Sequence, residues 1–65
     1  MPKRMKLDAI RRAKKYTQEY MAQKLGVSRV TYARMEVNPQ KITMIQAARI
    51  AQILEVDMDD IIFLD

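Results

Sequence analysis

The sequence predicts an all-α fold, a compact bundle of five short helices. No stretch alternates apolar and polar residues with a period of two, and no Asn-Gly or Asp-Gly pair marks a hairpin. Apolar residues instead recur at helical spacing in short segments, and a Thr or Ser precedes three of them, where a helix N-cap belongs. A chain of 65 residues, 49% of them hydrophobic, can form one domain at most.

The first predicted helix covers residues 6–14 and the second covers residues 17–25, with Thr17 as its N-cap. Each carries an apolar face at helical spacing, so we expect each to bury one side. In the first helix one face comprises Leu7, Ile10, Arg11 and Lys14, with Ala13 beside it, and in the second the buried stripe comprises Met21, Ala22 and Leu25.

The third predicted helix covers residues 28–36, with Ser28 as its N-cap. A rotation of about 100° per residue turns Tyr32 and Met35 inward. The opposite face has two long cations and two small apolar groups but no carboxylate, whereas a merely soluble surface usually mixes charges of both signs. This outward face comprises Arg29, Val30, Ala33 and Arg34.

Two further helices are predicted after a loop over residues 37–42. The fourth covers residues 43–54, where Thr43 and Gln46 have the spacing of a capping box. The fifth opens at Asp57 and runs to Ile62, with acidic residues in its first turn that suit the helix dipole.

Gly26, the only glycine in the chain, separates the second and third predicted helices. Glycine adopts a positive φ without steric cost, so it suits a sharp turn at this point. We expect Val27 to fill the inner corner of the turn and Ala22 to sit where the helices cross. Two helices joined in this way form a helix-turn-helix motif.

Charge is distributed unevenly along the chain. Residues 1–41 contain eleven Lys and Arg against three acidic residues, and residues 42–65 contain one Arg against five. A basic front favours a polyanionic partner, and the alternative is a solvated surface with chance clustering. We divide the chain into a basic arm, residues 1–5, and a domain, residues 6–65. The arm either follows a nucleic-acid backbone or minor groove or is a disordered, solubilising tail.

Composition excludes several functions. The chain has no Cys and no His, which removes disulfides, thiolate chemistry, zinc sites and His-based catalysis. No apolar run approaches the length of a membrane span, and no secretory signal opens the chain. The carboxylates of Asp57, Asp59 and Asp60 cluster as helix-capping acids rather than as a Mg²⁺ site. We therefore expect a cytoplasmic protein that is not an enzyme, with no cofactor, metal, membrane or small-molecule ligand.

Residues 7–62 resemble the Cro and phage-repressor family of helix-turn-helix proteins. The resemblance lies in three blocks, LDAIRR, TQEYMAQKLGVSRVTYARME and TMIQAARIAQILEVDMDDII. It implies a lambda-repressor-like DNA-binding domain that acts as a sequence-specific transcriptional regulator, such as a Cro-like repressor. It also implies a homodimer on a palindromic, double-stranded operator, with the helix after Gly26 in the major groove.

The resemblance also implies roles for individual residues. Arg29 and Arg34 would read guanine, Val30 would pack on a thymine methyl, and Gln18 would bond adenine or a phosphate. Phosphate contacts would hold the protein on the DNA. The candidates for these backbone contacts are Thr17, Lys24, Ser28, Asn38, Gln40 and Lys41.

Arg11 and Glu36 occupy positions that form an ion pair in the family, joining the first helix to the third. Such a pair would set the pose of the reading helix, and the alternative is two solvated charges. The chain departs from the family at Lys15, Asn38 and Glu55, where glycine is common. A left-handed conformation costs Lys or Glu about 1 kcal/mol, so we expect these loops to differ in shape.

A second hypothesis concerns the apolar end of the chain, Ile62, Phe63 and Leu64. These residues either form a homodimer interface or complete the core of the monomer. If they bind another protein, the chain is an interaction module, such as an antitoxin or a regulatory subunit that acts through its apolar C-terminal helix.

Overall fold

The computed structural model describes residues 4–63, which form four α-helices and one pair of short strands. Two 3₁₀ turns, η1 and η2, precede the last helix and the last strand. In chain order the elements are β1 (Met5–Lys6), α1 (Leu7–Ala13), α2 (Gln18–Leu25), α3 (Arg29–Val37), η1 (Pro39–Lys41), α4 (Met44–Leu54), η2 (Met58–Asp60) and β2 (Ile61–Ile62).

The prediction of a fifth helix over residues 57–62 is wrong. From Met58 to Asp60 the chain makes a single 3₁₀ turn, and it then continues as β2, which pairs in parallel with β1. Met5, the last residue of the predicted arm, lies opposite Ile61 in this strand pair. The backbone groups of β2 bond to a distant strand instead of closing a helical turn, and this pairing places Ile61 in the core, 1% exposed.

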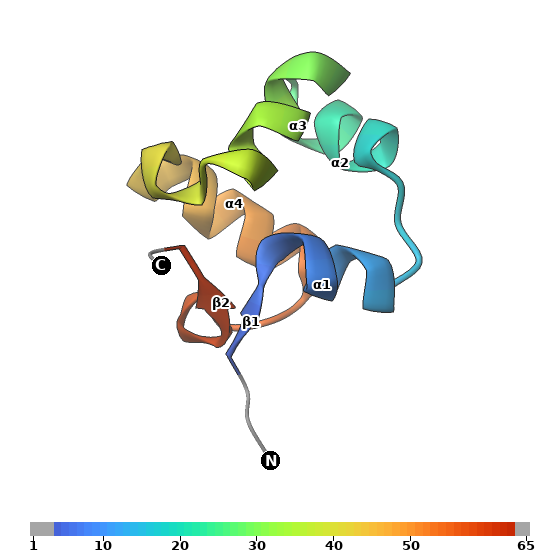
Figure 1. Cartoon of the computed structure of the whole chain (residues 1–65). Helices are drawn as coiled ribbons and strands as arrows, with labels where there is room; N and C mark the ends of the chain where they lie inside the picture. Colours follow the sequence, from blue (N-terminus) through green and yellow to red (C-terminus); the bar gives the residue numbers. More distant parts are fainter. Residues whose placement is uncertain (1–3, 64–65) are drawn as a thin grey trace.

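The hydrophobic core draws on every α-helix and on β2. In Figure 1, α4 crosses the middle of the molecule, with α2 and α3 above it and α1 and the strand pair below. Among the described residues, the core cluster comprises Leu7, Ile10, Met21, Ala22, Tyr32, Met35, Ile50, Ala51, Leu54 and Ile61. The inward faces predicted for the second and third helices are thus confirmed, although Leu25 is only partly buried.

Three helices begin at the N-caps that the sequence predicts. The hydroxyls of Thr17, Ser28 and Thr43 each accept a hydrogen bond from the backbone N–H three residues later, at 3.0–3.1 Å. The side chain of Gln46 in turn accepts from the N–H of Thr43, which completes the predicted capping box. Because these bonds satisfy donors at the helix starts, they define where α2, α3 and α4 begin.

Three helices also end in the same way. Lys15, Gly26 and Glu55 adopt left-handed backbone conformations, with φ of 63°, 78° and 59°. In each case the N–H of this residue donates to the carbonyl three residues earlier, and the next N–H donates to the carbonyl five residues earlier, at 2.9–3.2 Å. The prediction that these loops differ in shape from those of the family is therefore wrong at Lys15 and Glu55. At Asn38 the backbone does lie outside the left-handed region, with φ of −125°.

Candidate nucleic-acid interface

The turn at Gly26 sets the direction of α3. A Cβ placed on Gly26 would meet no atom within 4 Å, so glycine is needed for its backbone angle and not for space. Val27 packs against the core at the inner corner, and Ala22 is 2% exposed. The turn therefore holds α3 against α2 through one face and leaves its other face outward.

The outward face of α3 carries the side chains that the periodicity predicts. Arg29 and Arg34 are exposed, and Val30 is 54% exposed. Tyr32 and Met35, on the opposite face, are buried. Within the described residues, neither guanidinium makes a hydrogen bond or an ion pair with the protein, so both groups are free to contact a partner.

A cleft of about 810 Å³ lies where the start of α2 faces the start of α3. The hydroxyl of Thr17 is occupied by its N-cap bond, but Arg29 and Arg12 bring positive charge to the same cleft. We call this the α2 cleft. It is lined by Arg11, Arg12, Tyr16, Thr17, Gln18, Glu19 and Arg29.

A buried ion pair adjoins the α2 cleft through Arg11, which lines it. Nε of Arg11 donates to Oε2 of Glu36 at 2.6 Å, and Nη2 donates to Oε1 at 3.2 Å. The third donor of Arg11, Nη1, bonds the carbonyl oxygen of Tyr16 at 2.9 Å. The amide nitrogen of Gln18 donates to Oε1 of Glu36 at 3.0 Å. The guanidinium of Arg11 thus joins α1 to α3 and to the loop before α2.

The network also changes the acidity of its members. Burial on its own raises the pKa of Glu36, but the hydrogen bond from Arg11, the nearby Tyr32 hydroxyl and the bond from Gln18 outweigh it, so the pKa is lowered overall. The Glu36 hydrogen bond chiefly accounts for the raised pKa of Arg11. Burial, aided by Glu36, raises the pKa of Tyr32. Glu36 is therefore a carboxylate, and Tyr32 a neutral phenol, at neutral pH.

A second cleft, of about 340 Å³, lies on the other side of α3, and we call it the α4 cleft. Arg34 and Lys41 are exposed in it. Neither side chain bonds to the protein within the described part of the chain, and the amide oxygen of Gln46 is used by its capping bond. The α4 cleft is lined by Thr31, Arg34, Met35, Asn38, Lys41 and Gln46.

Two predicted backbone-contact residues lie elsewhere. The ammonium of Lys24 stands 5.5 Å from the ring centre of Tyr20, and Arg49 of α4 donates to the Lys24 carbonyl oxygen at 3.3 Å. Lys24 lines neither cleft. Gln40 lines an apolar groove instead of the α4 cleft. Of the six predicted residues, Thr17 lies in the α2 cleft, Asn38 and Lys41 lie in the α4 cleft, and Ser28 caps α3.

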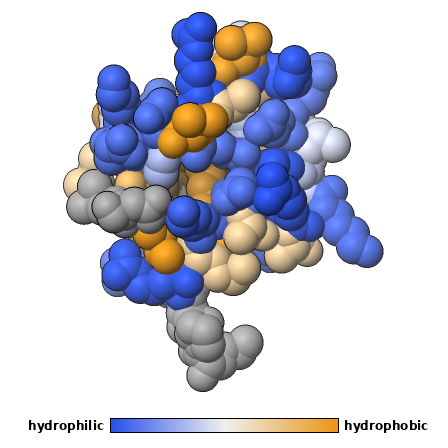
Figure 2. Space-filling model, viewed as in Figure 1, coloured by the Kyte–Doolittle hydropathy of each residue, from blue (hydrophilic) through white to orange (hydrophobic). Residues whose placement is uncertain are grey.

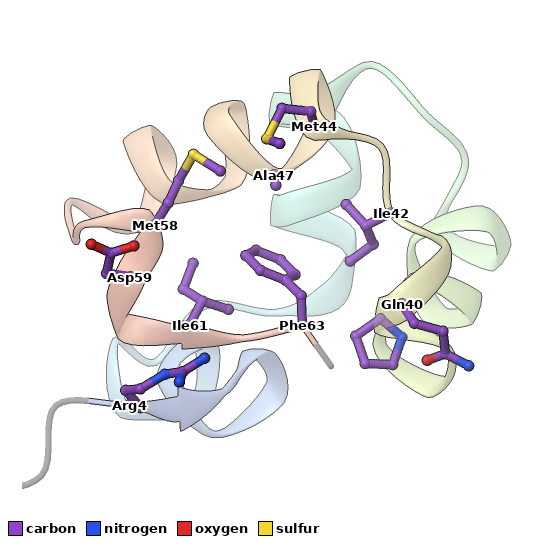
Figure 3. Close-up of a pocket in the computed structure, with 10 residues that line it drawn as sticks. Arg4, Gln40, Ile42, Met44, Ala47, Met58, Asp59, Ile61 and Phe63 are labelled. Carbon is purple, nitrogen blue, oxygen red and sulfur yellow. The ribbon is translucent and has the colours of Figure 1, made fainter. Parts of the chain in front are cut away.

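The apolar groove has a volume of about 510 Å³ and lies between the start of α4 and the segment from η2 to β2 (Figure 3). Ile42, Ala47, Ile61 and Phe63 are among its walls, and Arg4 and Asp59 stand at its edge. Ile62 and Phe63 are half-buried, and Leu64 lies outside the described residues. On the face seen in Figure 2, hydrophilic residues predominate and apolar patches lie between them.

Six residues of the two clefts were not predicted from the sequence as site residues: Arg12, Tyr16 and Glu19 in the α2 cleft, and Thr31, Met35 and Gln46 in the α4 cleft. Arg12 bonds Asp8 four residues earlier in α1, at 3.0 Å, and also reaches the α2 cleft. Thr31 and Gln46 line the α4 cleft. The capping-box pattern indicated Gln46 as a helix-capping residue, and no sequence signal pointed to Thr31 or to a shared cleft.

A match to a protein-family model agrees with this geometry. The helix-turn-helix model matches residues 7–61, from the start of α1 into β2. The chain belongs to the XRE-type helix-turn-helix family. This XRE-type family consists of DNA-binding transcription regulators and is in general not enzymatic. Searches of curated proteins and of solved structures returned no match for this XRE-type chain.

Two further findings concern other classes of site. Between residues 4 and 63, no helix has both the length and the apolar character needed to cross a membrane. The same residues contain no group of three or more metal-ligating side chains placed to hold an ion.

Proposed function

We propose that the protein is a sequence-specific transcriptional regulator, a Cro-like repressor, that binds a palindromic DNA operator through the major groove as a homodimer. The outward face of α3 is the observation that carries the proposal. Arg29, Val30 and Arg34 are exposed on one side of a helix that lacks a carboxylate there, and neither guanidinium is bonded to the protein. A guanidinium in a major groove can form a forked pair with guanine.

The two clefts support the same function. A helix in the major groove has a phosphate backbone on each side. Arg12 and Arg29 bring positive charge to the α2 cleft on one side of α3, and Arg34 and Lys41 bring it to the α4 cleft on the other. Each of the two phosphate backbones would thus meet cationic side chains. Glu19 also lines the α2 cleft and carries the opposite charge.

The size of the chain is consistent with a dimer on DNA. Its principal extents are 33 × 23 × 18 Å. Half-sites of such operators lie one helical turn apart, about 34 Å. In the proposed dimer, two copies pack side by side and each presents its α3 helix to one half-site. Ile62, Phe63 and the apolar groove supply apolar surface for that contact.

Selection of bound double-stranded oligonucleotides from a random pool tests the proposal. We expect a palindrome with half-site centres about 34 Å apart. If each subunit touches about four phosphates, log affinity falls against log salt with a slope of roughly −7. Binding without sequence preference, or no binding at all, contradicts the proposal.

The open apolar groove favours one alternative, a protein-interaction module such as an antitoxin or a regulatory subunit. This module would act through the groove and β2, because the apolar end of the chain is not a helix. Sedimentation at micromolar concentration separates the two functions. A strict monomer that also ignores DNA supports the interaction module.

A further inference from the structure

One hydrogen bond in the α2 cleft fixes which end of the Gln18 amide faces outward. Nε2 of Gln18 donates to Oε1 of Glu36 at 3.0 Å. A carboxylate has no proton to donate, so only the amide nitrogen can satisfy this contact. If the amide were flipped, its oxygen would face an oxygen of Glu36, and two acceptors would meet with no proton between them. Water could not relieve this contact easily, because the Glu36 side chain is only 6% exposed.

Glu36 cannot easily turn away to release the amide. Its two oxygens accept both Nε and Nη2 of Arg11, and Arg11 is tied in addition to the carbonyl oxygen of Tyr16. A forked Arg–carboxylate pair fixes the plane of the carboxylate as well as its position. The amide of Gln18 is therefore oriented before any partner arrives.

The oxygen of the same amide remains available to a partner. Within residues 4–63, Oε1 of Gln18 accepts no hydrogen bond, and it is not among the enclosed polar atoms that lack one. Gln18 lines the α2 cleft together with Arg29, at the edge of the outward face of α3. The cleft therefore presents a fixed acceptor beside a free guanidinium.

We propose that Glu36 is a positioning residue that makes Gln18 selective for an amino base, adenine or cytosine, over a keto base, guanine or thymine. This inference rests on the proposed DNA-binding function. In the major groove adenine N6 and cytosine N4 donate hydrogen bonds, whereas guanine O6 and thymine O4 accept them. A phosphate has only acceptors, so it can bond the remaining N–H of Gln18 but leaves the amide oxygen without a donor. The remaining N–H of Gln18 can add a bond to adenine N7.

Operator selection with variants tests the inference. Gln18→Met removes the amide while leaving the Arg11–Glu36 pair in place, and Gln52→Met is the matched control on α4, because Gln52 is exposed and lines neither cleft. We expect the wild type and the control to prefer A or C over G or T at one position of each half-site, by roughly tenfold. Gln18→Met loses this preference at that position alone.

Glu36→Gln tests the positioning role. A neutral amide at residue 36 both accepts and donates, so it no longer selects one orientation of Gln18. The amino-over-keto preference should fall at the same operator position and at no other, an effect that a general loss of stability cannot produce.

A second measurement needs no DNA and covers the case in which Glu36→Gln fails to fold. In the free wild-type protein, NMR hydrogen exchange of the side-chain amides should be slower for Gln18 than for the exposed Gln52. Equal exchange overturns the inference, as does a Gln18→Met variant with an unchanged operator. If the wild type selects an operator and Gln18→Met selects the same one, only this inference fails. If the wild type selects none, the proposed function fails first.

Discussion

The two clefts beside α3 differ in what holds their side chains. In the α2 cleft, Arg11, Glu36 and Gln18 are bonded to one another and largely buried. In the α4 cleft, Arg34 and Lys41 are exposed and bond to nothing within the described residues. The network of Arg11, Glu36 and Gln18 is therefore ordered by the folded chain itself, whereas Arg34 and Lys41 can become ordered only against a partner.

This difference separates folding from binding. Removing Arg11 or Glu36 breaks bonds that the monomer already makes, so the free energy of unfolding should fall. Removing the side chain of Arg34 or Lys41 breaks no such bond, so affinity should fall while stability is kept. The contrast would disappear if DNA binding alone ordered the side chains of both clefts, or if folding alone ordered both sets.

The largest effect is expected for Arg11→Met. It leaves the Glu36 carboxylate buried without its partner, which typically costs about 3–5 kcal/mol of unfolding free energy. Urea denaturation followed by circular dichroism measures the loss. The exposed residue Arg34 provides the comparison, because Arg34→Met should stay within roughly 0.5 kcal/mol of the wild type.

A double variant shows whether the pair itself is responsible. Arg11→Met with Glu36→Leu replaces both charges by apolar groups, so no buried charge is left alone. We expect it to be more stable than either single variant. A double variant no more stable than the single ones would show that the pairing does not contribute.

An intermediate effect is expected for Arg34→Ala in the α4 cleft. Loss of a forked contact to guanine should weaken binding to the selected operator by about 1–3 kcal/mol, with random DNA much less affected. Fluorescence anisotropy at fixed salt measures both affinities, and unfolding should be unchanged. Equal losses on the two DNAs would mean that Arg34 contacts only the backbone.

The smallest effect is a pH dependence confined to the α2 cleft. The pKa of Glu36 lies below its ordinary value of 4.5, so its stabilisation is complete above pH 4.5 and is lost as the pH falls through the lower, folded-state pKa. Urea unfolding along an acid series should therefore give a shallower decline for the Arg11→Met, Glu36→Leu double variant than for the wild type. Parallel declines would contradict this assignment.

Local signals predicted most of the fold. The N-caps at Thr17, Ser28 and Thr43 and the left-handed turn at Gly26 depend on neighbouring residues, so the sequence indicates them directly. The end of the chain depends on a distant partner. Met58, Ile61 and Ile62 have helical spacing, but pairing with β1 overrides it, and a strand of two residues has too little sequence to carry a pattern.

The candidate site divides in the same way. Rotation about the helix axis predicts that Arg29, Val30 and Arg34 face outward, because one helix determines it. The bond from Gln18 to Glu36 depends on rotamers of two helices packed together, so no spacing along the chain indicates it. Lys24 and Gln40, predicted as backbone contacts, line neither cleft: Lys24 lies over Tyr20 of its own helix, and Gln40 lines the apolar groove.

The pairing of Met5 with Ile61 has a consequence for synthesis in the cell. Among the described elements β1 is made before every other, but it gains its neighbour only when β2 has been made. Until Ile61 clears the exit tunnel, the core lacks one of its fully enclosed side chains, and α1 has no strand pair beneath it. The nascent chain therefore completes its fold only after translation has passed β2.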